Sequence, residues 1–112
     1  LMSFQIAAPL LDACVLATLT MGDAYGYALT QKIQSVVAIS ESTLYPVLRR
    51  LQQSGCLNVY DKPFQGRNRR YYAITTAGKA LLDGYRQEWV SYRNQVETLL
   101  YAQQEDSSNE KE

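Results

Sequence analysis

The spacing of apolar residues changes twice along this chain, and these changes restrict its fold more than any other sequence feature. Three successive runs, at residues 10–19, 24–37 and 40–55, have apolar positions spaced as in a helix. Residues 57–74 instead contain two β-prone runs around a segment with proline and glycine, which predicts a β-hairpin. Helical spacing returns at residues 76–102. A chain of 112 residues has room for one hydrophobic core, so we expect these elements to share it.

Several residues predict where the expected helices begin. Asp23 is a candidate N-cap of the second helix, and Gly26 in its first turn is expected to allow the close approach of a neighbouring helix. Ser40 or Ser42 can cap the third helix. Pro46 leaves two alternatives for that helix, which either begins late or bends at the proline.

Positive charge is concentrated in one segment although the whole chain is neutral, with 11 Lys+Arg and 11 Asp+Glu. Residues 49–72 contain six basic residues and one acidic residue, a net charge of +5. Residues 103–112 contain one basic and four acidic residues, a net charge of −3, and are expected to form a disordered tail. A neutral protein with one basic segment is suited to a polyanionic partner.

The composition excludes several classes of enzyme and of metal site. The chain has no histidine, which removes the commonest general base, the commonest transition-metal ligand and every Ser-His or Cys-His nucleophilic site. It also lacks GxGxxG and phosphate-loop motifs. We therefore expect no enzymatic activity, no metal and no cofactor. Two cysteines, Cys14 and Cys56, are too few for a disulfide framework and are expected to be buried thiols.

No apolar run approaches the length of about 20 residues that a membrane span requires. Residues 13–19, the longest apolar run, lack the basic leader and the cleavage site of a signal peptide. We therefore expect a cytoplasmic protein with no membrane partner.

The last expected helix, capped by Thr75, carries a second repeat. Its apolar residues recur at spacings of three, four, three, four and three, which is the spacing of a coiled-coil seam. These residues are Leu82, Tyr85, Trp89, Tyr92, Val96 and Leu99. A terminal helix of this length would overhang a small domain, so we expect a homodimer joined through residues 77–102. The alternative is a monomer in which the helix packs its stripe on its own core.

Three motifs lie along the chain, at residues 25–29 (Tyr-Gly-Tyr-Ala-Leu), 42–51 and 66–78. The first resembles the Gly-Tyr-x-Leu signature of the PadR-like transcriptional regulators, and the second resembles the recognition-helix motif of that family. The third resembles its wing strand and the start of its last helix. Three helices followed by a hairpin is also the order of a winged helix-turn-helix. The expected fold is therefore mainly α (α+β), with a winged helix-turn-helix over residues 1–76 and a dimerisation helix over residues 77–102, as in the short subclass of the family.

The resemblance and the basic segment together predict a DNA-binding surface. The start of a recognition helix usually reaches base edges in the major groove, and a basic wing can bind phosphates. The predicted DNA-binding residues are Ser42, Thr43, Tyr45, Arg49, Arg50, Lys62, Arg67, Arg69 and Arg70. An alternative for Arg70 is an ion pair with Asp61 across the hairpin. Tyr71 and Tyr72 point to opposite faces of their strand, so one of them is expected in the core.

The expected function is that of a homodimeric repressor that binds a pseudo-palindromic double-stranded DNA operator and is relieved by a small aromatic ligand. Resemblance to ligand-binding members of the family implies that Trp89 stacks on a flat aromatic ligand between the subunits, with Arg93 and Asp12 as further candidates for that site. From the residues alone, the alternative to a ligand contact is that Trp89 anchors the core or the interface. A functional alternative is a winged-helix protein–protein interaction module that does not bind DNA.

Overall fold

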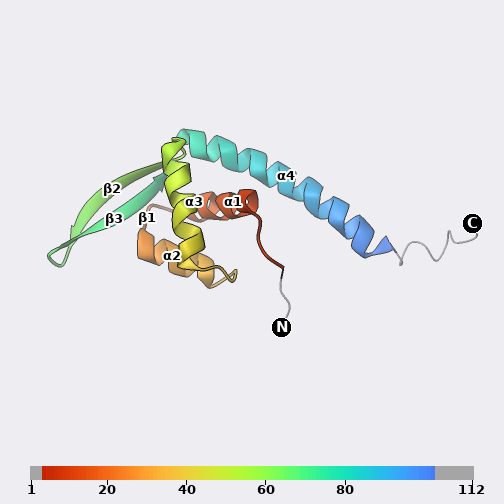
Figure 1. Cartoon of the computed structure of the whole chain (residues 1–112). Coiled ribbons are helices and arrows are strands. Elements are labelled where there is room, and N and C mark those ends of the chain that lie inside the picture. The colour runs from red at the N-terminus through yellow and green to blue at the C-terminus, as the bar shows by residue number, and fades with distance from the viewer. Residues whose placement is uncertain (1–3, 103–112) are drawn as a thin grey trace, which may run out of the picture.

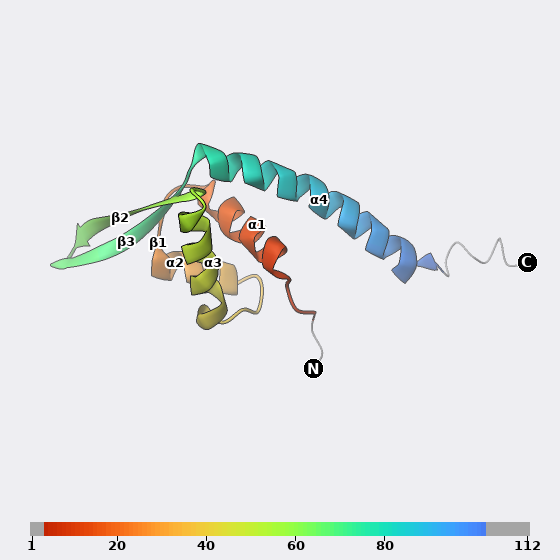
Figure 2. The same cartoon turned by 45° about the horizontal axis from the view of Figure 1, so that its top comes forward.

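Within residues 4–102, which the computed structural model describes, the helical runs form four helices and the β-prone runs form a long hairpin (Figure 1). In chain order the elements are α1 (Ala8–Leu19), β1 (Ala24–Tyr25), α2 (Gly26–Gln34), α3 (Glu41–Gln53), β2 (Leu57–Phe64), β3 (Arg67–Ile74) and α4 (Thr76–Leu100). Helices α1 to α3 pack together at the base of the hairpin, and α4 projects to the opposite side (Figure 1; Figure 2). The predicted winged helix-turn-helix with a long C-terminal helix is confirmed. The expected acidic tail lies outside the described residues.

Local capping explains where α3 and α4 begin. The hydroxyl of Ser40 accepts a hydrogen bond from the backbone N–H of Thr43 at 3.2 Å, so Ser40 is the N-cap of α3. The helix begins before Pro46 and continues through it, which excludes a late start. The hydroxyl of Thr75 accepts from the backbone N–H of Gly78 at 3.0 Å, and Thr75 is the N-cap of α4 as predicted.

The predicted bounds of the second helix, residues 24–37, are wrong at both ends, because α2 spans Gly26–Gln34. Ala24 and Tyr25 are extended and pair with β3 as a third, short strand, and the helix begins only at Gly26. Asp23 does not cap this helix, whose N-cap is Tyr25. The carboxylate of Asp23 instead accepts a hydrogen bond from the hydroxyl of Tyr60 on β2 at 2.7 Å. The strand pairing of two residues therefore overrides the helical spacing that surrounds them.

Gly26 does allow a close approach, as expected, but the neighbouring element is strand β3 and not a helix. A Cβ atom at Gly26 would lie 3.2 Å from Cε1 of the Tyr72 ring on β3. Tyr72 is buried, whereas Tyr71 beside it is only partly covered. The expectation that one tyrosine of this pair enters the core is confirmed.

The hairpin is longer and its turn tighter than the sequence predicted. Strand β2 continues through Pro63, and the turn consists of Gln65 and Gly66 only, both with positive φ, 51° and 78°. Two successive residues with positive φ suit the right-handed twist of a two-residue hairpin. Proline is tolerated on β2 because the sheet order β1-β3-β2 makes it an edge strand. The basic residues expected at a loose tip therefore lie on regular strands.

The core is built from one face of each helix of the winged domain, from the base of the hairpin and from the start of α4. Its apolar side chains are Leu11, Val15, Leu16, Leu19, Leu29, Ile33, Leu44, Val47, Leu48, Leu51, Cys56, Leu57, Tyr72 and Leu82. Cys56 is buried as expected, but Cys14 is only half-buried, and desolvation raises the pKa of its thiol. None of the helices in residues 4–102 combines the length and the hydrophobicity needed to cross a membrane.

Candidate nucleic-acid interface

Helix α3 divides cleanly into a buried and an exposed face. Its apolar stripe packs into the core, whereas Ser42, Thr43, Tyr45 and Arg49 are all exposed. The hydroxyls of Ser42 and Thr43 lie 3.0 and 2.9 Å from that of Ser40, so the cap of the helix also holds these two side chains. Four of the predicted DNA-binding side chains therefore share one preorganised surface at the start of α3.

A hollow of about 460 Å³ adjoins this exposed face. It lies between the start of α2, the middle of α3 and strand β3, and its lining residues are Tyr25, Gly26, Tyr27, Tyr45, Arg49, Gln52, Arg70 and Tyr72. Two guanidinium groups, from Arg49 and Arg70, thus line one concave surface together with tyrosine side chains. Guanidinium and tyrosine hydroxyl groups both bind phosphate oxygens.

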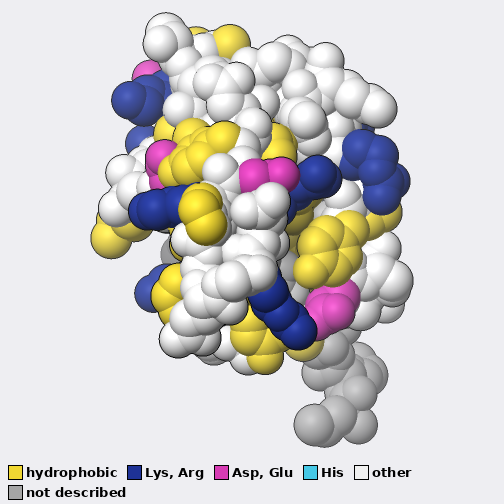
Figure 3. Space-filling model, turned by 90° about the vertical axis from the view of Figure 1, so that its left-hand side faces the viewer, with side chains coloured by type: hydrophobic (Ala, Val, Ile, Leu, Met, Phe, Trp, Pro, Cys, Tyr) yellow, Lys and Arg dark blue, Asp and Glu magenta, His cyan; other side chains and the backbone are white. Residues whose placement is uncertain are grey.

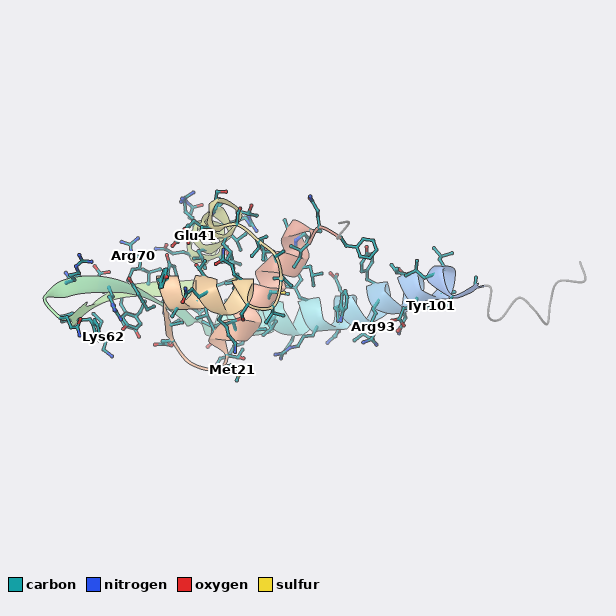
Figure 4. The ribbon with its side chains drawn as sticks, turned by 90° about the horizontal axis from the view of Figure 1, so that it is seen from below. Met21, Glu41, Lys62, Arg70, Arg93 and Tyr101 are labelled. Carbon is teal, nitrogen blue, oxygen red and sulfur yellow. The ribbon has the colours of Figure 1, made fainter. Side chains whose placement is uncertain are left out.

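The basic residues of the wing lie on two opposite faces. The register pairs Asp61 with Arg70 on one face and Lys62 with Arg69 on the other. Figure 4 shows Arg70 and Lys62 on opposite sides of the hairpin, with Arg70 on the side of α3. Of the four cations predicted at the wing tip, Lys62, Arg67 and Arg69 therefore share one face, and strand alternation places only Arg70 on the other.

The alternative pairing of Arg70 with Asp61 is confirmed, with Nε of Arg70 3.9 Å from Oδ1 of Asp61. Both side chains are largely exposed. Pairs of this kind contribute little to stability, so Arg70 can exchange this partner for another anion.

On the other face of the wing, the cations alternate with aromatic rings. The guanidinium of Arg69 lies 3.6 Å from the ring centre of Phe64 and 4.4 Å from that of Tyr25. The rings of Tyr60 and Tyr71 stack with their centres 5.5 Å apart. Seen end-on in Figure 3, the wing displays its blue cations interleaved with yellow side chains. The Arg69 side chain is held between rings and is less free to reach a phosphate than the exposed Arg67.

The hydrogen bond between Tyr60 and Asp23 braces the base of this face. It raises the pKa of the Tyr60 hydroxyl, with further contributions from desolvation and from the charge of Asp23. The hydroxyl therefore remains a donor at neutral pH.

The side chain of Arg50 is 49% exposed, but its guanidinium reaches toward α1. Its guanidinium donates a hydrogen bond to the carboxylate of Asp12 on α1, which is only 7% exposed. The hydroxyl of Tyr85 on α4 donates to the second oxygen of the same carboxylate at 3.3 Å. Burial, and next the Asp12 carboxylate, raise the pKa of the Tyr85 hydroxyl, so it remains protonated. Arg50 is thus paired within its own chain, and Asp12 is engaged in the interior. Their roles in binding DNA and a ligand stay predictions.

A second and larger hollow, of about 830 Å³, lies between the N-terminal segment and α4. Its lining residues are Phe4, Gln5, Ala7, Pro9, Leu10, Ala13, Tyr85, Glu88, Trp89, Tyr92, Arg93, Val96, Glu97, Leu100 and Tyr101. We call it the α4 groove. Trp89 and Arg93, two of the three predicted ligand-binding residues, line it, and Asp12 does not. Figure 4 places Arg93 on α4, far from the wing residues Lys62 and Arg70.

Comparison with known proteins decides the family. Residues 15–84 match the family described as "Transcriptional regulator PadR-like family". The chain belongs to the PadR-like family. The membership implies DNA-binding regulation of transcription.

The chain is also similar to individual proteins, one of which is itself named PadR-like. The crystal structure of smu.1704 from Streptococcus mutans has a TM-score of 0.80 and 35% identity, with 88% of this chain and 93% of that chain covered. A PadR-like transcriptional regulator from Bacillus cereus has a TM-score of 0.73 and 31% identity, with 81% and 91% covered. An uncharacterised protein from Lysinibacillus sphaericus is 32% identical over 95 residues, which are 80% of this chain and 87% of that protein.

The PadR-like match covers one of the two hollows. Residues 15–84 include the exposed face of α3 and the whole wing, but they end before Trp89 and Arg93. The sequence reasoning missed Tyr27 and Gln52, which line the hollow beside α3. Tyr27 lies within the Gly-Tyr motif, which was the available signal. It also missed Phe4 in the α4 groove, because the N-terminal segment has no periodic pattern.

Proposed function

We propose that this PadR-like regulator is a homodimeric repressor that binds a pseudo-palindromic DNA duplex and is released by a flat aromatic ligand. One observation carries the DNA-binding part of this proposal. The face of α3 opposite the core exposes Ser42, Thr43, Tyr45 and Arg49 together, next to a concave surface that Arg70 also lines.

In this proposal the start of α3 enters the major groove. Arg49 reads a base edge or a phosphate, and the hydroxyls of Ser42 and Thr43 and the ring of Tyr45 contact the sugar-phosphate backbone. On the wing, the exposed Lys62 and Arg67 contact phosphates from one face, where Arg69 is partly covered between two rings, and Arg70 contributes from the α3 side. Arg50 is no longer proposed as a DNA contact.

The proposed dimer is joined through the second half of α4. This part of the helix exposes Trp89, Val90, Tyr92, Leu99, Leu100 and Tyr101. An apolar surface of this extent is characteristic of an interaction site. A second copy of the same helix supplies a complementary apolar face by symmetry. The proposed dimer surface therefore begins after Tyr85, since Leu82 already belongs to the core of its own chain.

The proposed ligand site is the α4 groove. Trp89 and Tyr92 have ring centres 6.4 Å apart, and they face the groove together with Arg93. Such rings can stack on a flat aromatic molecule, and a guanidinium can pair with a carboxylate on it. The ligand releases DNA only if it binds better to a dimer whose two α3 helices are wrongly spaced for the major groove of DNA.

Selection of bound sites from a random duplex pool tests the DNA-binding part. The proposal predicts an enriched palindrome whose half-sites lie about one helical turn, or a multiple, apart. Affinity for that duplex should fall steeply as salt rises. A protein–protein module would enrich no sequence and would show no such dependence on salt.

Titration of phenolic acids and flat dyes against Trp89 fluorescence tests the ligand part. Trp89 is the single tryptophan of the chain, so its emission reports on the groove without a label. The proposal predicts that at least one compound quenches this emission and also weakens operator binding. If no compound does so, Trp89 is an interface anchor only.

A further inference from the structure

The carboxylate of Asp12 is a meeting point of three helices. Asp12 lies on α1, receives a hydrogen bond from Arg50 of α3 on one oxygen and receives one from Tyr85 of α4 on the other. Among the ion pairs in residues 4–102, the Asp12–Arg50 pair alone joins two different helices. Since the carboxylate is buried, each of its two partners compensates part of its lost hydration.

The two partners of Asp12 belong to elements with different proposed roles. Arg50 directly follows Arg49, whose side chain lines the hollow beside α3. Tyr85 lines the α4 groove, and Trp89 follows it one helical turn later in the same groove. A single carboxylate therefore connects the proposed DNA-reading helix with the proposed ligand site.

A change at either hydrogen-bond partner of Asp12 affects the other partner. If α4 moves so that the hydroxyl of Tyr85 leaves Asp12, one oxygen of a buried carboxylate loses its partner. The carboxylate must then rely on the guanidinium of Arg50 alone, which favours a different position of the end of α3. The same sequence runs in reverse when α3 is displaced, because coupling between two sites is reciprocal.

We propose that Asp12, Arg50 and Tyr85 are positioning residues that couple the α4 groove to the orientation of the recognition helix α3. Arg50 acts in this scheme through Asp12 and not as a contact to DNA. The inference rests on the proposed function, namely that α3 binds duplex DNA.

The test follows Trp89 emission when the duplex selected from the random pool is added to the full chain. Four proteins are compared: wild type, Tyr85→Phe, Thr98→Val and Arg50→Met. Tyr85→Phe removes only the hydroxyl that reaches Asp12 and keeps the ring in the groove. Thr98→Val is the matched control, because it also removes one hydroxyl from α4, and that hydroxyl donates to the backbone oxygen of Asn94 and not to Asp12. Circular dichroism verifies that each variant is folded.

Binding of the duplex should change Trp89 emission in the wild type and equally in Thr98→Val. Tyr85→Phe should still bind the duplex but should lose about half or more of the emission change. Arg50→Met should bind roughly tenfold more weakly, a typical allosteric coupling. Its slope of affinity against salt should be unchanged, because no phosphate contact is lost.

Other results would overturn the coupling. An emission change in Tyr85→Phe as large as in the wild type, or no change in the wild type itself, contradicts it. A loss in Thr98→Val equal to that in Tyr85→Phe also contradicts it, because the effect would not pass through Asp12. A salt slope lowered by about one in Arg50→Met would show that Arg50 contacts a phosphate directly. If the wild type binds no duplex at all, the proposed function fails and the coupling falls with it, whereas the other outcomes reject the coupling alone.

Discussion

The two halves of α4 carry the same apolar spacing but have opposite surroundings. In the first half, Leu82 is 2% exposed and Tyr85 is bonded to Asp12, so this part packs on α1. In the second half, Trp89 is 41% exposed and Leu99 is 80% exposed. Figure 2 shows α1 beneath the beginning of α4 and the rest of the helix extending beyond it. Periodicity thus identifies the apolar face of a helix, but it does not identify what covers that face.

The two halves of α4 should differ in what they stabilise, and substitutions can test this difference. The first half of α4 should contribute to the stability of the single chain, and the second half should contribute to association.

Leu82→Ala should lower the free energy of unfolding by about 3 to 5 kcal/mol, since it leaves a cavity in a packed core. Urea unfolding followed by circular dichroism measures the change. Leu99→Ala is the matched control from the second half. Any shift in the unfolding midpoint of Leu99→Ala should come from weaker association, so the shift should vary with protein concentration. Equal, concentration-independent losses in both variants would remove the distinction between the two halves.

Gly78→Ala should destabilise the chain by about 3 kcal/mol, because an added methyl group has no space there. It would overlap the backbone oxygen of Cys56 and would lie 2.8 Å from Cγ1 of Ile74. Thermal unfolding at fixed protein concentration measures this effect. A wild-type melting temperature would mean that the start of α4 is not clamped against the hairpin base.

Trp89→Ala should weaken dimer formation by about 2 kcal/mol, the cost of truncating an interface hot spot. This corresponds to a dissociation constant raised roughly 30-fold. Dilution followed by analytical size-exclusion chromatography measures the constant. An unchanged constant would place the interface elsewhere and would leave Trp89 to the ligand site alone.

Gly84→Ala should stabilise the chain by about 1 kcal/mol, since alanine is the better helix former. No atom lies within 4 Å of the position that its Cβ would take. Gly84 is therefore the matched counterpart of Gly78 within the same helix. Urea unfolding decides this prediction, and a destabilised Gly84→Ala would indicate a contact made only in the assembled protein.

The sequence was sufficient for the elements that depend on local chemistry. The apolar stripe of α3 and the Thr75 cap of α4 were predicted and are present, because both depend on neighbours within one helical turn. Strand β1 could not be predicted, because it exists only through pairing with β3, which is distant in sequence. The extent of the hairpin was missed for a related reason. Pro63 indicates a turn, and only its position on an edge strand makes it acceptable in β2.

The residues of the candidate site also divide into those that local spacing predicts and those that depend on contacts distant in sequence. Helical spacing alone puts Ser42 and Arg49 opposite the apolar stripe of α3 and Tyr45 on its flank, and all three side chains are exposed. The partner of Arg50 could not be predicted, because Asp12 lies 38 residues away in sequence. The stacking of Arg69 between Phe64 and Tyr25 was likewise hidden, since it depends on the exact register of the hairpin and on strand β1.

Sedimentation velocity of the wild-type chain at micromolar concentration tests the central claim most directly. If the exposed second half of α4 is covered by a second copy, a single species with the mass of a dimer should be observed. Trp89→Ala measured at the same concentration should shift part of the material to the monomer. A wild-type chain that sediments as a stable monomer at this concentration would contradict the account, because the apolar face of α4 would then be open to solvent.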